Sequence, residues 1–254
     1  MSLNPQRTSP LDSRELYLFD TMGFLRLPGF LGRDDVQASR DEIVQLPSRF
    51  MWGDKERFDR LAESCGILGE FAASRVVRGC VEPLINQPYR LIESYAFRRD
   101  KDSVFHLHNG NSEILHYGDR FVRRNMSFNH TFHDGKLYCM FVKVLVYLTD
   151  VTAEEDGPFC YLQGSHKANW PWFSDEDADH SQQELTRANF PSLDWAPVRA
   201  GDAIVLNEAL LHGTLPKSSP GERLFMAFSY APAFVADWKE IDKDSGDITK
   251  LGHY

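Results

Sequence analysis

Two residues in the C-terminal part of the chain, His212 and Arg223, have the types and the spacing needed for metal chemistry. His212 lies in a His-Gly-Thr turn, ten residues intervene, and Arg223 opens the next apolar run. An imidazole is a common ligand of divalent transition metals, and a guanidinium binds a carboxylate through two parallel hydrogen bonds. Together they suit a metal enzyme whose co-substrate is a keto-dicarboxylate.

A third ligand for such a metal is not evident beside either residue. A mononuclear iron site of this kind combines two histidines with one Asp or Glu. No histidine in the sequence is followed two positions later by Asp or Glu. The usual carboxylate ligand is therefore missing.

The elements that must hold these residues change along the chain from helices to strands. A short helix is expected over residues 15–20, a strand over 23–31, a helix from 34 to about 46, and further helical patterning over 54–84. Alternating apolar residues then predict strands over 89–97, 136–148, 157–162, 203–206 and 224–230. Helices followed by a series of short strands indicate an α+β fold whose functional half is an antiparallel sandwich or barrel.

Several strand residues need separate comment. Lys143 interrupts an apolar run, and we expect its side chain to reach the rim rather than bind an anion inside the barrel. Tyr95 and Tyr147 are expected in the core, where they can also line a pocket. The Asp-Gly pair that begins at Asp134 predicts a hairpin turn after a strand over 126–132.

The composition suits one intracellular domain. With 254 residues, 42% of them hydrophobic, one domain over 1–254 is expected, with a flexible tail over 1–13 and a long insertion or lid over 167–199. The net charge of −9 argues against a nucleic-acid or anionic-membrane surface. Because no leader and no membrane-length apolar run is present, the four scattered cysteines are interpreted as reduced thiols of a cytoplasmic protein.

Three segments together resemble the phytanoyl-CoA dioxygenase family of Fe(II)- and 2-oxoglutarate-dependent oxygenases. The family's opening helix and strand are similar to FDTMGFLRLPGFLGRDDV. Its strand, acidic turn and Gly-Ser-His-Lys loop are similar to VLVYLTDVTAEEDGPFCYLQGSHKANW, and the third segment runs from Gly201 to Tyr230. The segments occur in the family's order across most of the chain. His166, in the Gly-Ser-His-Lys loop, is expected to be structural.

The resemblance implies a double-stranded β-helix, a jelly-roll barrel that holds Fe(II) at its open end and carries N-terminal helices. It also implies that His212 binds the metal, that Arg223 pairs with the distal carboxylate of 2-oxoglutarate, and that Thr214 adds a hydroxyl hydrogen bond to that group. The other histidine should come early in the barrel, and the candidates are His106, His108, His116, His130 and His133. We favour His108, because FHLHNG resembles the Leu-His-Gly-Gly segment of one branch of the family.

The family's carboxylate ligand falls at position 110, where this chain has Gly110. The glycine opens a position for chloride or another anion, as in iron halogenases, or another acid replaces the ligand, or the barrel binds a ligand without turnover. Glu208 and Glu113 are the candidate acids. On an extended strand Glu208 is roughly 13 Å from His212, so it qualifies only if Glu-Ala-Leu-Leu-His curls.

These features favour an Fe(II)- and 2-oxoglutarate-dependent dioxygenase that hydroxylates or otherwise oxidises a small organic substrate. The alternatives are a halogenase that uses Gly110 as its chloride position and a non-catalytic ligand-binding barrel. Neither nucleic acid nor a membrane is expected as a partner. Substrate identity and oligomeric state stay open.

Overall fold

The computed structural model describes residues 3, 5–51, 55–64, 66–100, 105–109, 114–117, 121–124, 130–168 and 184–233. Its helices are α1 (Ser13–Met22), α2 (Arg33–Ile43), α3 (Leu61–Ser64), α4 (Gly66–Ala72) and α5 (Arg75–Ile85), with a short 3-10 helix, η4, at Ser165–Lys167. Its early strands are β1 (Phe24–Leu27), β2 (Ser48–Phe50), β3 (Glu56–Asp59), β4 (Tyr89–Arg99), β5 (Phe105–His108), β6 (Ile114–Tyr117), β7 (Phe121–Arg124) and β8 (His130–His133). The later strands are β9 (Lys136–Cys139), β10 (Val142–Tyr147), β11 (Phe159–Leu162), β12 (Leu193–Ala196), β13 (Ala203–Asn207), β14 (His212–Thr214) and β15 (Arg223–Pro232).

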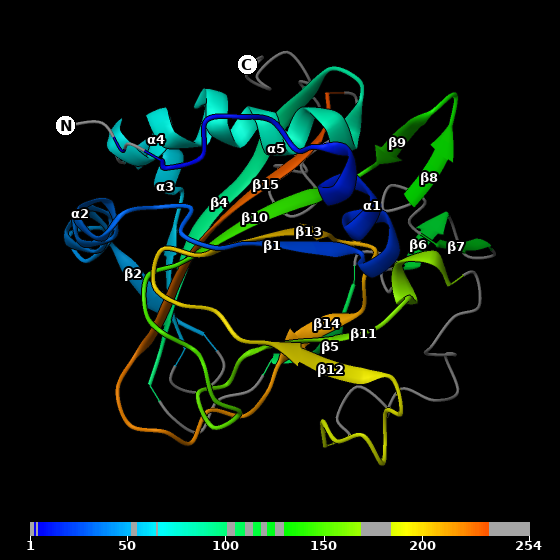
Figure 1. Ribbon diagram of the computed structural model, residues 1–254. Coiled ribbons are helices and arrows are strands. Elements are labelled where there is room, and N and C mark those ends of the chain that lie inside the picture. Colours follow the sequence, from blue (N-terminus) through cyan, green and yellow to red (C-terminus); the bar gives the residue numbers. More distant parts are fainter. Residues whose placement is uncertain are drawn as a thin grey trace.

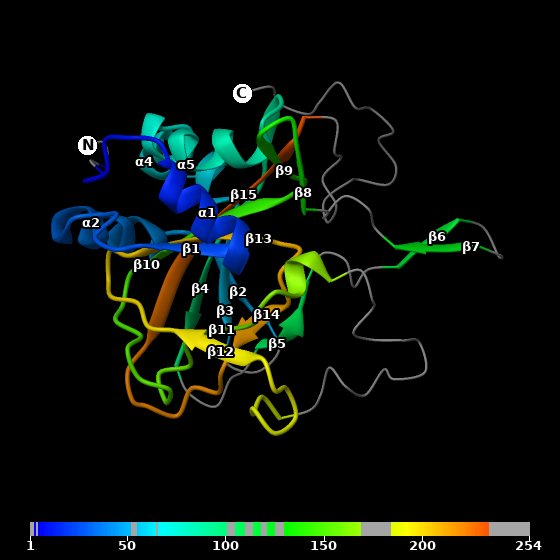
Figure 2. The same ribbon diagram turned by 45° about the vertical axis from the view of Figure 1, so that its right-hand side comes forward.

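Two antiparallel sheets form the body of the molecule. The larger sheet has seven strands in the order β1-β13-β10-β15-β4-β3-β2, and the smaller has four in the order β12-β11-β14-β5. The helices lie on one side of the large sheet and the small sheet lies on the other (Figures 1 and 2). Helices on one face of an antiparallel sheet, with a second sheet on the other, give the α+β jelly-roll arrangement that the sequence predicted.

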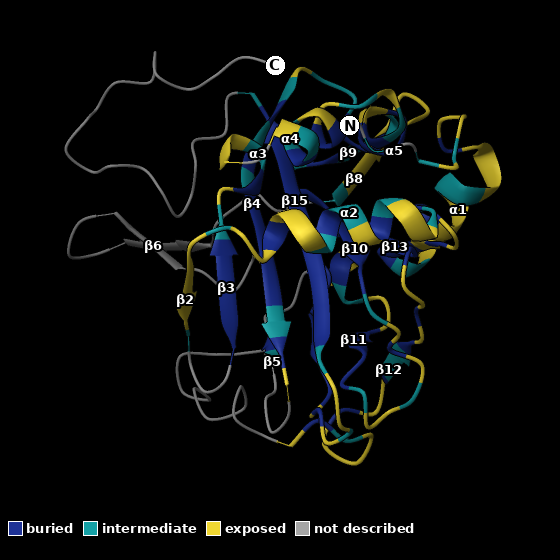
Figure 3. Cartoon of the chain, turned by 90° about the vertical axis from the view of Figure 1, so that its left-hand side faces the viewer, coloured by how far each residue is buried: buried dark blue, intermediate teal, exposed yellow. Residues whose placement is uncertain are grey.

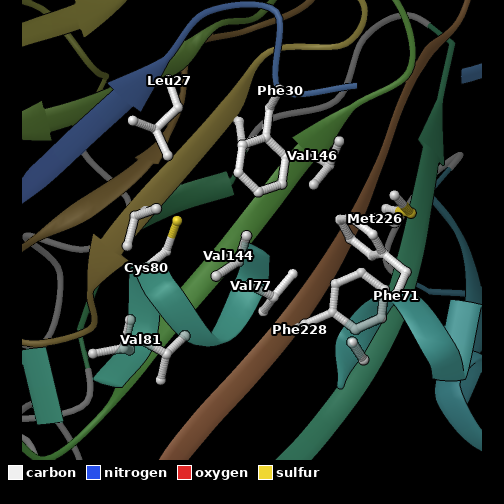
Figure 4. Close-up of a cluster of buried hydrophobic side chains, with 14 of the residues drawn as sticks. Leu27, Phe30, Phe71, Val77, Cys80, Val81, Val144, Val146, Met226 and Phe228 are labelled. Atoms are coloured by element: carbon white, nitrogen blue, oxygen red, sulfur yellow. The ribbon is translucent and has the colours of Figure 1, made fainter. Parts of the chain in front are cut away.

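Strand β10 shows why the large sheet is buried on both faces. Val144 and Val146 pack with residues of α5 in one hydrophobic cluster, which Figure 4 shows together with Val77 and Cys80. Leu145 and Tyr147 belong to a second cluster, between the two sheets. Because successive side chains of a strand point to opposite faces, a run that is apolar throughout predicts a central strand. The burial along β10 and β15 in Figure 3 confirms this expectation.

The predicted strand over 136–148 is two strands in the structure. Lys136–Cys139 pairs with His130–His133 across the turn at Asp134, whose φ is 50°. Val142–Tyr147 instead joins the large sheet, between β13 and β15. The apolar run contains no turn residue at the junction, so the periodicity could not reveal the change of partner.

Parts of the predicted tail and of the predicted insertion have defined contacts in the structure. Within the tail over 1–13, Leu11 is buried and its backbone N–H donates to the carbonyl of Gly79 at 3.1 Å. Within the insertion over 167–199, Leu193–Ala196 forms β12 on the edge of the small sheet, while residues 169–183 lie outside the described part. No helix in the described part of the chain is long and apolar enough to cross a membrane.

Candidate active site

Three side chains that can bind a metal meet between the two sheets. One ligand atom from each of His108, Glu208 and His212 lies within 4.8 Å of the other two. His108 ends β5 and lies opposite His212 in the pairing with β14, so their rings are 4.4 Å apart between centroids. The histidine pair that the sequence favoured is therefore brought together by one strand register.

Glu208 reaches the histidines because the chain curls after β13. The side-chain oxygen of Asn207 accepts a hydrogen bond from the Ala209 N–H at 3.0 Å. The backbone carbonyl of Asn207 accepts one from the Leu210 N–H, also at 3.0 Å. Asparagine commonly closes a turn in this way. As a result, a carboxylate oxygen of Glu208 lies 4.0 Å from His212 Nε2, and the condition set for Glu208 in the sequence is met.

The two imidazoles are oriented by their Nδ1 atoms. Nδ1 of His212 lies 2.7 Å from the carbonyl of Leu210, and Nδ1 of His108 lies 2.9 Å from the carbonyl of His106. A carbonyl can only accept, so each Nδ1 carries the hydrogen and each Nε2 keeps a lone pair for a metal. Burial, and then the nearby His108, lower the pKa of His212 to about 3, which keeps its ring neutral.

The prediction that the Lys143 side chain reaches the rim of the barrel is wrong. Nζ of this side chain lies inside the barrel, 3.1 Å from each carboxylate oxygen of Glu208, and both side chains are buried. Burial alone would lower the pKa of Lys143, but the charge of Glu208 outweighs it and raises that pKa. The reason for the wrong prediction is this buried partner, which lies 65 positions further along the chain. Burial likewise acts to raise the pKa of Glu208, but its electrostatic contacts, of which the charge of Lys143 is the largest, lower it overall. The carboxylate is therefore ionised.

One cavity inside the barrel joins the histidines to the predicted arginine. His108, Lys143 and His212 line it together with Thr214 and Arg223. Aromatic side chains complete its wall, namely Tyr95, Phe97, Tyr147, Phe159 and Phe225. Both tyrosines thus line the pocket as well as the core. A larger hollow beside α5 contains none of these residues.

Arg223 is almost fully buried in this cavity, at 1% exposure. Its Nη2 donates to the hydroxyl of Tyr147 at 3.2 Å. Its Nε and Nη1 have no hydrogen-bond partner among the described residues. Since an unsatisfied buried charge is costly, this guanidinium suits an anion that enters the cavity.

Arg99 was not identified as a site residue from the sequence. Its side chain is 0% exposed, and its Nη1 donates to the hydroxyl of Thr214. Burial, and then the charge of Arg223, lower the pKa of Arg99 to about 8. The periodicity of β4 could have identified Arg99, because Tyr95, Phe97 and Arg99 are two positions apart and therefore lie on the same face of the strand.

The other histidine candidates lie apart from this cluster where the structure describes them. His130 contacts the carboxylate of Asp20, and His133 stacks on Tyr138. Nε2 of His166 lies 2.9 Å from the carbonyl of Asp20, in agreement with a structural role. Gly110, Glu113 and the side chain of His116 lie outside the described residues.

Comparison with known proteins agrees with this geometry. The family model for phytanoyl-CoA dioxygenase (PhyH) matches residues 19–225. The chain belongs to the phytanoyl-CoA dioxygenase family. A comparison with curated proteins found no match.

Solved structures similar to this family member include HygX from Streptomyces hygroscopicus. HygX with nickel, 2-oxoglutarate and hygromycin B bound is 44% identical, with a TM-score of 0.84 and 96% of each chain covered. HygX with iron bound is also 44% identical, with a TM-score of 0.79 and the same coverage. The epimerase SnoN from nogalamycin biosynthesis, with Fe3+ and alpha ketoglutarate, is 19% identical, with a TM-score of 0.64 over 87% of this chain and 83% of its own. SnoN therefore supports the fold alone.

These comparisons confirm the double-stranded β-helix and the cofactors that the sequence predicted. As a phytanoyl-CoA dioxygenase family member, the chain is a non-haem iron enzyme that depends on 2-oxoglutarate. The reading as a non-catalytic barrel is set aside.

Proposed function

We propose that His108, Glu208 and His212 bind the iron, and that Arg223 with Thr214 binds the distal carboxylate of 2-oxoglutarate. The observation that carries this assignment is the close approach of the three ligand atoms, within 4.8 Å, with His108 and His212 lining the same cavity as Arg223. Two imidazoles and one carboxylate are the donor set that non-haem Fe(II) oxygenases use. Nε and Nη1 of Arg223, which have no hydrogen-bond partner in the part of the chain that the structure describes, fit the far end of a keto-dicarboxylate.

The protein contributes binding, orientation and exclusion of water. Neutral Nε2 atoms and the ionised Glu208 supply the metal ligands, while Arg223 orients the keto acid by its far carboxylate. Phe97, Tyr147 and Phe225 line the space between these ends and keep it apolar. When bound, iron and 2-oxoglutarate supply the oxidising power, through decarboxylation of the keto acid and activation of dioxygen.

The substrate in this proposal is a small, polar organic molecule of the aminoglycoside class. Support comes from HygX, which is 44% identical over 96% of each chain and was crystallised with hygromycin B. The net charge of −9 also favours this class, because aminoglycosides carry several ammonium groups at neutral pH. The reaction is a hydroxylation or a related oxidation of that molecule.

The position of Glu208 argues against the halogenase. That alternative needs a metal without a carboxylate ligand, so that chloride can occupy the position left by Gly110. Here Glu208 lies 4.0 Å from His212 Nε2 and offers a carboxylate from another part of the chain. We therefore expect the product to be the same with and without chloride.

The direct test is succinate formation from 2-oxoglutarate by enzyme reconstituted anaerobically with Fe(II) and then exposed to oxygen. We expect hygromycin B or a related aminoglycoside to stimulate succinate release and to yield an oxidised product detectable by mass. An Arg223→Met variant, which lacks the proposed contact to 2-oxoglutarate, should lose this activity. If no aminoglycoside stimulates succinate release, the proposed substrate class is wrong. A chlorinated product would show that the enzyme is a halogenase instead.

A further inference from the structure

Lys143 is a buried cation that contacts Glu208, one of the three candidate metal ligands. It lies on β10 opposite Leu206 of β13 and Ser229 of β15, with an exposure of 6%. Nζ lies 3.1 Å from both carboxylate oxygens of Glu208, which is 2% exposed. The rings of Phe141 and Tyr95 cover it, with centroids 5.4 and 5.8 Å from Nζ.

The Glu208 side chain needs such a contact because it projects from a turn. The backbone of this turn is anchored, since the Glu208 N–H donates to the carbonyl of Phe141 at 3.1 Å. The carboxylate itself hydrogen-bonds to Lys143 through Oε1, while Oε2 is buried without a hydrogen-bond partner in the described part and lies 4.0 Å from His212 Nε2. Nζ thus hydrogen-bonds to one oxygen and lies equally close to the other, which faces His212.

We propose that Lys143 is a positioning residue that fixes the Glu208 carboxylate so that one oxygen binds the metal. This inference rests on the proposed function, because it takes Glu208 as an iron ligand. Groups that orient metal ligands from behind commonly contribute 10- to 100-fold to metal affinity. Lys143 fills that role with a charge-assisted hydrogen bond, which is stronger than a neutral one.

The test measures binding of Ni²⁺ to the metal-free full-length protein by calorimetry. For Lys143→Met, which keeps most of the apolar stem and removes the charge, we expect Ni²⁺ affinity to fall by roughly 10- to 100-fold. If this variant does not fold, Lys143→Gln replaces it, since its shorter amide cannot reach both oxygens. Affinity that stays the same, falls by less than tenfold or rises would overturn the proposal.

A double-mutant cycle separates positioning of Glu208 from a general effect on the fold. If Lys143 acts through Glu208, then Lys143→Met should not weaken Ni²⁺ binding further in a Glu208→Ala background. An equal loss in both backgrounds would overturn the proposal, because it would mean that Lys143 acts elsewhere. If Glu208→Ala alone leaves Ni²⁺ affinity unchanged, the ligand set fails, and the proposed function fails with it. The two failures are therefore distinguishable.

Discussion

Arg99 lies directly opposite Arg223 in the antiparallel pairing of β4 and β15, and both guanidiniums are buried. Like charges at opposite positions of a sheet repel each other. The pair becomes favourable when an anion lies close by. Thr214 accepts a hydrogen bond from Arg99 and lines the same cavity as Arg223. This end of the barrel is thus prepared for a carboxylate.

Replacement of Arg223 by methionine should weaken the binding of 2-oxoglutarate. A hydrogen bond to a charged group contributes about 1.5–3 kcal/mol, so the loss of each one corresponds to roughly 10- to 150-fold in affinity. The measurement is titration of the Ni²⁺-loaded protein with 2-oxoglutarate. Ni²⁺ affinity in the absence of 2-oxoglutarate should stay within twofold, and a variant that binds the keto acid normally would show that the arginine serves another purpose.

Thr214→Val should weaken the binding of 2-oxoglutarate and lower the free energy of unfolding. The substitution keeps the shape but removes the hydroxyl that accepts from the buried Arg99. A buried donor left without its acceptor costs about 1–3 kcal/mol of unfolding free energy, and the KM for 2-oxoglutarate should rise. Thr214→Ser keeps the hydroxyl and should preserve both properties. Equal stability of the valine and serine variants in denaturant would contradict the expected role of this hydrogen bond.

His212→Ala and His108→Ala should each lower Ni²⁺ affinity by more than the roughly 10- to 100-fold typical of supporting residues. The reason is that each removes a ligand atom from the cluster rather than a contact behind it. His133→Ala is the matched control, because His133 is an exposed histidine that stacks on Tyr138. Calorimetry with Ni²⁺ measures these affinities. A His108 variant with normal affinity would mean that another residue supplies the second imidazole ligand.

The residues that could be predicted from the sequence are those set by local pattern. The alternation of β4 and β15, the apolar run of β10 and the His-Gly-Thr turn each report on a strand or turn that forms from neighbouring residues. His212, Arg223 and Thr214 were found in this way, with the family resemblance, and the structure places them in one cavity.

The residues that were missed or left open depend on contacts distant in sequence. Lys143 looked like a rim residue because its partner, Glu208, lies 65 positions away. Arg99 was missed because the strand that pairs with it, β15, begins more than a hundred residues later. Glu208 stayed conditional because its use depends on a turn set by the side chain of Asn207. Local periodicity carries no information on such pairings.

His166 should make the protein lose stability in mild acid. Burial, offset only in part by the contact with the Asp20 carbonyl, lowers the pKa of His166 to about 4. In the unfolded chain a histidine titrates near 6.5, so between about pH 6.5 and 4 the unfolded state binds more protons than the folded state. The contribution is complete above pH 6.5 and is lost as the pH falls toward 4, by roughly 2–3 kcal/mol of unfolding free energy.

Urea unfolding of the wild type and His166→Gln across this pH range measures the effect. Glutamine does not titrate, so the variant should lose less stability than the wild type between pH 7 and 4. His133→Gln is the control, because that exposed side chain should leave the wild-type pH profile unchanged. Parallel profiles for the wild type and His166→Gln would mean that His166 becomes protonated in the folded protein as readily as in the unfolded chain. In that case the loop that carries it would have to be open to solvent.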